Sequence, residues 1–295
     1  MSEGIPSSIE ESKSIDTPLA AQIRSFEVEH QPNNLEDEEL RTDYAWLVSQ
    51  WLATKSHGVF NNDKNELTPA ADIYGSIKWI EAPEDNLAAW TTSMDSIWVN
   101  LAAPEFNKNQ GEQNTLLKNL RNTLSHEGVH FMNVMREVSD RLPLFTEVDP
   151  SLTGETNAHL QGFQLNLYDE NGVVRGERLR QFNEALTEII SIHNQTESGL
   201  APSLPAYPDY DGNHPRADAI IKDVDAVLKL ARIEVDDVAA LSAYSDLEGL
   251  AQKFANQTSL QFESDDEKSK YGLQLIDAIE RGDRQAIGEY IMLLA

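Results

Sequence analysis

Apolar residues recur every three or four positions over most of the chain, which is the spacing of an amphipathic helix. This spacing predicts helices over residues 35–54, 113–135, 178–194, 216–232, 234–256 and 268–294. Short runs rich in β-branched and aromatic residues predict strands over 73–80 and 96–101. The pair Asn171-Gly172 lies between two further apolar runs and predicts a β-hairpin over 163–176. The pattern therefore predicts an α+β fold that is mostly helical.

The pattern also divides the chain into three parts. Residues 1–36 are rich in Ser, Glu, Pro and Asn, which predicts an acidic segment that is disordered or loosely docked. Its stretch 19–28 has enough apolar residues to dock, so a plain tail and a pro-segment that covers a cleft both stay open. Residues 37–140 are expected to form an N-terminal subdomain, and residues 141–295 a helical C-terminal subdomain.

Composition restricts the classes of partner. The chain has 50 Asp and Glu residues against 23 Lys and Arg, a formal net charge of −27. Such a surface repels nucleic acids and anionic membranes, so neither is expected as a partner. High solubility and attraction of basic substrates are both compatible with it. Cysteine is absent, which excludes disulfides, thiolate metal ligands and a cysteine nucleophile.

Targeting signals are also absent from the sequence pattern. No apolar run approaches the roughly 18 residues that a membrane-spanning helix needs. The first residues have neither a basic region nor an apolar core, so no standard signal peptide is expected. The expected location is the cytoplasm, or outside the cell after export without a standard signal peptide.

The most informative motif is His-Glu-x-x-His within the predicted helix 113–135. His126 and His130 are spaced by one helical turn, so both imidazoles leave the same face, as two ligands of a tetrahedral Zn²⁺ must. Glu127 lies beside them, where its carboxylate can act as general base on a water. The flanking residues are mostly apolar, which places this helix in the wall of a cleft.

A zinc site of this kind needs a third protein ligand from farther along the chain: a Glu, an Asp or a His. Glu184 and Glu188 share one face of the predicted helix 178–194, where two like charges make sense if one binds a cation and the other binds a ligand imidazole. Two solvent-facing carboxylates are the alternative. His159 is a weaker candidate ligand, and His193 lies about half a turn away from Glu184.

Together, the segments His126-Glu127-Gly128-Val129-His130 and Asn183-Glu184-Ala185-Leu186-Thr187-Glu188 resemble the gluzincin metallopeptidases, and especially the small bacterial minigluzincins. The resemblance covers about residues 95–295. It implies Glu184 as the third zinc ligand, Glu188 as the hydrogen-bond partner of His126, and Asn183 as the motif asparagine. Ala185 and Glu188 depart from the more familiar Gly and Asp.

The resemblance also implies a zincin-like fold, with a small mixed sheet above the motif helix and the third ligand in a helical C-terminal subdomain. A strand at the rim of the cleft would pair with the substrate backbone, and residues 97–101 are the candidate, although an ordinary edge strand fits equally well. The oxyanion would be stabilised by a later Tyr or His. Tyr207 and Tyr210 are preferred to His214, and loop packing is the alternative role for the two tyrosines.

The sequence therefore predicts a zinc metalloendopeptidase that acts on peptides or proteins, with one Zn²⁺ per chain as its cofactor. Two alternatives stay open. One is a catalytically inactive protein of the gluzincin fold that binds or regulates through a peptide. The other is a zinc hydrolase of a non-peptide substrate, because one fold can support several chemistries.

Overall fold

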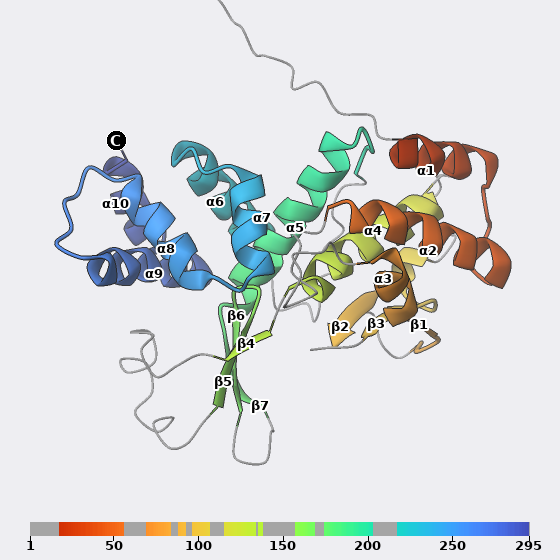
Figure 1. Cartoon of the computed structure of the whole chain (residues 1–295), viewed down its shortest axis with the longest axis horizontal. Coiled ribbons are helices and arrows are strands. Elements are labelled where there is room, and N and C mark those ends of the chain that lie inside the picture. The colour runs from red at the N-terminus through yellow and green to blue at the C-terminus, as the bar shows by residue number, and fades with distance from the viewer. Residues whose placement is uncertain are drawn as a thin grey trace, which may run out of the picture.

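The computed structural model describes residues 18–55, 69–83, 88–92, 96–106, 115–133, 135–137, 157–168, 174–202 and 217–294. Its α-helices are α1 (Pro18–Glu29), α2 (Glu38–Ala53), α3 (Ala70–Ser76), α4 (Thr115–Phe131), α5 (Arg180–Glu197), α6 (Ala217–Leu230), α7 (Val235–Ala243), α8 (Leu247–Asn256), α9 (Asp265–Arg281) and α10 (Arg284–Met292). Its strands are β1 (Ile77–Ile80), β2 (Ala89–Thr92), β3 (Ser96–Asn100), β4 (Met135–Glu137), β5 (Asn157–Gln161), β6 (Gln164–Tyr168) and β7 (Val174–Arg178). The chain is α+β and mostly helical, as predicted (Figure 1).

A small mixed sheet packs on α4. Its strand order is β1-β3-β2, with β1 parallel and β2 antiparallel to the central β3. The prediction that residues 97–101 form the rim strand is therefore wrong, because β3 is paired on both sides. The strands at the two edges are β1 and β2, and β2 lies in a stretch that the sequence pattern left without structure. The prediction of a strand over 73–80 is correct only from Ile77, because the preceding residues form α3, which starts after Pro69.

The N-terminal helices pack against α4 and share one hydrophobic core with the mixed sheet. Helix α1 buries Ala20, Ile23 and Glu27, although it belongs to the segment expected to be disordered or loosely docked. Helix α2 lies close against α4 at Gly128, where an added Cβ would be 2.8 Å from Cδ1 of Leu52. Only a glycine allows this approach without displacing the leucine.

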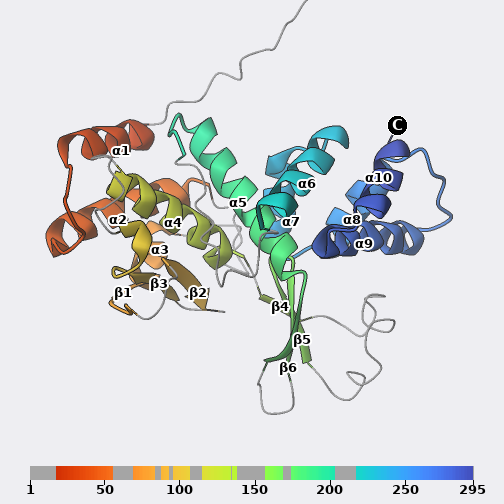
Figure 2. The same cartoon turned by 180° about the vertical axis from the view of Figure 1, so that it is seen from behind.

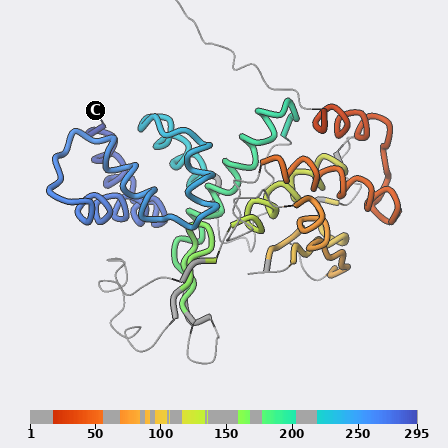
Figure 3. The backbone as a smooth tube through the Cα atoms, viewed as in Figure 1, coloured from red at the N-terminus to blue at the C-terminus, as the bar shows by residue number. Residues whose placement is uncertain are grey.

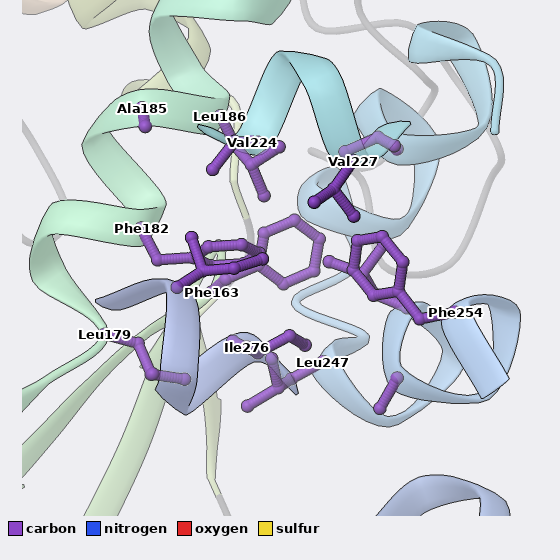
Figure 4. Close-up of a cluster of buried hydrophobic side chains, with 14 of the residues drawn as sticks. Phe163, Leu179, Phe182, Ala185, Leu186, Val224, Val227, Leu247, Phe254 and Ile276 are labelled. Carbon is purple, nitrogen blue, oxygen red and sulfur yellow. The ribbon is translucent and has the colours of Figure 1, made fainter. Parts of the chain in front are cut away.

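A four-stranded antiparallel sheet, in the order β4-β5-β6-β7, projects from the middle of the molecule (Figure 1). The pairing of β6 with β7 confirms the predicted hairpin, and β5 joins it on the other side. The tight turn between β5 and β6 has Gly162 at a φ of +58°, a conformation that side chains rarely adopt. The next residue, Phe163, is fully buried and lies against Phe182 of α5 (Figure 4).

Two hydrophobic cores lie on either side of the α4–α5 pair. One joins α1, α2, α3, the mixed sheet and most of the apolar side of α4. The other joins α5 to the C-terminal helices and the turn before β6. Helices α4 and α5 lie side by side between them in both views (Figures 1 and 2). The tube in Figure 3 shows the chain passing from the first group of helices through the projecting sheet into the second.

The proposed division of the chain at residues 140 and 141 falls outside the described residues and stays a prediction. The three predicted C-terminal helices are five in the described structure. Asp246 starts α8 with a side-chain cap after Ser245 at a φ of 51°. Gly282 ends α9 in the left-handed conformation, and Asp283 caps α10. Among the described residues, no helix is long and apolar enough to cross a membrane.

Candidate metal centre

Helix α4 presents both motif histidines on the face that meets α5. The rings of His126 and His130 are 5.0 Å apart between centroids and nearly perpendicular. Leu124 and Val129, on other faces of the same helix, are buried in the two hydrophobic cores, so packing on both sides fixes the rotation of α4. The sequence pattern predicted this helix, and its rotation places the histidines as predicted.

Helix α5 brings a carboxylate to the same point. Oε2 of Glu184 is 3.1 Å from Nε2 of His126 and 3.3 Å from Nε2 of His130. One ligand atom from each of the three residues can be chosen so that all lie within 4.8 Å of one another. Ligands at the usual Zn–N and Zn–O distances around a tetrahedral ion are about 3.3 Å apart. The three residues therefore fit the donor set and spacing of a divalent metal ion.

The tautomer of His126 gives a second reason to expect a cation. Nδ1 of His126 is 2.9 Å from Oε2 of Glu188, a carboxylate that can only accept, so Nδ1 carries the proton. In a neutral ring, Nε2 then presents a lone pair towards the carboxylate of Glu184. Two acceptors at that distance repel each other unless a proton or a metal ion lies between them. The contact between Nδ1 of His126 and Oε2 of Glu188 is the one that the resemblance implied for Glu188.

The protonation equilibria of the metal-free site follow the same contacts. Burial acts to lower the pKa of His126, but hydrogen bonds to Glu184 and Glu188 outweigh it and hold that pKa well above its usual value. Burial acts to raise the pKa of Glu184, but the charge of His130 and hydrogen bonds from both histidines hold it well below its usual value. Without a metal, a proton on the imidazole of His126 therefore stabilises the site.

The carboxylate of Glu127 is buried beside this group. The residue is 8% exposed, and its Oε2 accepts a hydrogen bond from the hydroxyl of Thr91 at 2.8 Å. The same hydroxyl is 3.1 Å from the backbone carbonyl oxygen of Glu127. Thr91 belongs to β2, which the sequence pattern did not reveal, and no motif pointed to this residue.

Asn183 has a different contact from that of Glu188. Its Oδ1 accepts the backbone N–H of Phe163 at 2.8 Å. A Cβ added at Gly162 would be 2.6 Å from this oxygen and from Nδ2 of Asn133, just beyond the end of α4. The asparagine thus fastens the turn between β5 and β6 to α5, one residue before Glu184.

The other described candidate histidines, His159 and His193, are not part of the group. His159 lies in β5 with Nδ1 3.2 Å from Sδ of Met135. His193 faces away from the centre, as expected, and its Nε2 is 3.1 Å from Oδ1 of Asp236. Tyr207, Tyr210 and His214 lie outside the described residues, so their predicted role at the oxyanion stays a prediction.

A buried polar cluster lies farther along the α4–α5 contact. Arg121 of α4, 1% exposed, forms an ion pair with Glu27 of α1 and donates from Nε to Gln195 of α5 at 3.0 Å. Tyr44 of α2 donates to the same Glu27 carboxylate at 2.6 Å. Sequence reasoning missed this cluster, and its one visible sign was a charged residue on the otherwise apolar side of the motif helix. The cluster joins α1, α2, α4 and α5.

Between the two groups, the hydroxyl of Ser191 on α5 donates to that of Ser125 on α4 at 2.8 Å. Polar contacts thus occur at three levels along the two helices.

Comparisons with protein-family models, curated proteins and solved structures found no match for this chain. The function of the chain is therefore inferred from the geometry of the His126, His130 and Glu184 group.

Proposed function

We propose that the chain is a zinc-dependent metallopeptidase of the gluzincin type with a zincin-like fold. The observation that carries the proposal is the convergence of His126, His130 and Glu184 on one point, with the carboxylate of Glu127 held beside them. The contact of Glu188 with His126 matches the arrangement that the resemblance implies. The proposed cofactor is one Zn²⁺ per chain, held by two imidazoles and one carboxylate.

When bound there, Zn²⁺ would supply Lewis-acid polarisation of a carbonyl and a lowered pKa for a bound water. The chain supplies the proton transfers. Glu127 accepts the proton of the attacking water and then donates it to the leaving amine. Glu188 keeps the proton of His126 on Nδ1, so the lone pair of Nε2 is available to bind the metal ion.

The mixed sheet favours a peptide as the substrate. Strand β2 pairs with β3 on one side, and no other described strand pairs with its second side. Thr91 links this strand directly to Glu127. An extended peptide that added to the open edge of β2 would run past the proposed catalytic group. This is the role that the sequence analysis gave to residues 97–101, now transferred to β2.

The test is turnover of a peptide library by the zinc-loaded wild type and its Glu127→Gln variant. Loss of the general base should lower kcat by about 10²- to 10⁴-fold, while bound zinc and the melting temperature stay unchanged. Glu289→Gln, on the exposed face of α10, is the matched control and should retain full activity. Equal cleavage by wild type and Glu127→Gln, or no cleavage by zinc-loaded wild type, would contradict the proposal.

A further inference from the structure

The hydroxyl of Thr91 is the described side-chain contact that joins the mixed sheet to the Glu127 carboxylate. It lies 2.8 Å from Oε2 of Glu127 and 3.1 Å from the backbone oxygen of the same residue. Thr91 pairs with Ile97 in the register of β2 and β3, and Ile97 is fully buried on the side that faces α4. The strand therefore directs the hydroxyl at α4.

This contact restrains a side chain that would otherwise have several rotamers. A glutamate has three rotatable side-chain bonds, and fixing them costs conformational free energy. A hydrogen bond to one carboxylate oxygen limits the positions of the other, Oε1, which then remains for a water molecule. Because a hydrogen bond to a charged group is stronger than a neutral one, a single hydroxyl can dominate the choice of rotamer.

We propose that Thr91 is a positioning residue for Glu127 and that β2 fixes the general base as well as the peptide. The inference rests on the proposed function for its kinetic consequence, although the contact itself does not depend on it. A substrate strand paired with β2 and the Glu127 carboxylate bound by Thr91 of β2 would stay at a constant distance from each other, because both are bound to the same strand. Proximity of this kind contributes to the rate of the chemical step.

The test compares Thr91→Val with Thr91→Ser. Valine keeps the β-branched shape and the strand propensity but removes the hydroxyl, whereas serine keeps the hydroxyl and loses the methyl group. We expect Thr91→Val to lower kcat by about 10- to 100-fold with KM changed less than about 3-fold, and Thr91→Ser to retain most of the wild-type kcat. Zinc content should be equal in all three proteins.

The control for a general loss of stability is Thr258→Val. Thr258 is 8% exposed and donates to the carbonyl of Ala255 at 2.8 Å, in the C-terminal part of the chain away from β2. This variant should lose stability comparable to that of Thr91→Val and keep the wild-type kcat. A wild-type kcat in Thr91→Val, or a loss in Thr91→Ser as large as in Thr91→Val, would overturn the inference.

A readout independent of turnover separates this inference from the proposed function. Crystal structures of zinc-loaded wild type and Thr91→Val should show one Glu127 rotamer in wild type and a displaced or multiple one in the variant. If wild type cleaves no peptide, the proposed function fails, and the rotamers alone decide the positioning role of Thr91. An unchanged Glu127 rotamer in Thr91→Val would overturn it in either case.

Discussion

Helices α4 and α5 meet through charged or ionisable groups at two ends of one contact, and the two ends differ in how their charges are balanced. At one end, the guanidinium of Arg121 faces the carboxylate of Glu27 and the amide of Gln195. At the other end, the carboxylates of Glu184 and Glu188 face the imidazole of His126, which carries no fixed charge. We refer to these as the arginine end and the histidine end.

The difference separates a structural role from a functional one. The arginine end contains its own counter-charge, so it is complete in the folded chain and holds α1 against α4. The histidine end concentrates carboxylates around two imidazoles, and it is stabilised only when a proton or a metal ion joins it. Because the carboxylates around the imidazoles at the histidine end do not stabilise the fold by themselves, their arrangement supports a site for an exchangeable cation.

The largest effect on folding is expected at the arginine end. Glu27→Gln leaves the guanidinium of Arg121 buried without its counter-charge, which should cost about 3–5 kcal/mol of unfolding free energy. Urea unfolding of the metal-free protein measures it. Glu29→Gln, on the exposed side of the same helix, is the matched control and should cost less than about 0.5 kcal/mol. Equal stability of the two variants would show that the cluster does not hold α1 in place.

The next effect is expected at the histidine end, on metal binding. Glu188→Gln replaces the carboxylate that binds Nδ1 of His126, so zinc affinity should fall by about 10- to 100-fold. The unfolding free energy of the metal-free variant should stay within about 1 kcal/mol of wild type, unlike that of Glu27→Gln. Competition with a zinc chelator measures the affinity. An unchanged affinity would remove Glu188 from the site.

The smallest expected effect is the pH dependence of the stability of the metal-free protein, which arises at the histidine end. The pKa of His126 in the metal-free fold is raised above that in the unfolded chain, so its contribution to stability is complete below about pH 6.5 and is lost as pH rises through the folded-state pKa. The melting temperature of the metal-free protein should therefore fall as pH rises above 6.5. Zinc affinity should rise over the same range, because the metal competes with that proton.

His126→Ala is the control for this pH dependence, since it removes the titrating imidazole and should flatten the fall in melting temperature. A melting temperature of the metal-free wild type that rises from about pH 6.5 upward would contradict the charge balance described for the histidine end.

The parts of the fold that the sequence predicted are those set by local patterns. Helices α4 and α5 have strong apolar periodicity, so both could be predicted together with the face each presents. The hairpin of β6 and β7 could be predicted from the Asn171-Gly172 pair in the sequence between them. The histidine pair of the metal group followed from residue spacing within α4, because ligands one turn apart share a face wherever the helix packs. The assignment of Glu184 as the third ligand came from the resemblance to the gluzincins.

The parts that the sequence did not predict depend on contacts distant in the chain. Helix α1 places Glu27 in its buried face, where Arg121 of α4 and Tyr44 of α2 bind its carboxylate. Strand β2 is four residues long with no clear alternation, and its pairing with β3 defines it. The hydroxyl of Thr91 became a candidate only when that pairing placed it beside Glu127.

The measurement that tests the central claim most directly is the metal content of the purified protein after zinc is supplied, in wild type, His126→Ala, Glu184→Ala and Glu29→Gln. We predict one zinc per chain in wild type and in Glu29→Gln, and none in the two ligand variants while their helical content is retained. Wild type without metal, or zinc retained in Glu184→Ala, would contradict the assignment of the His126–His130–Glu184 group as the metal centre.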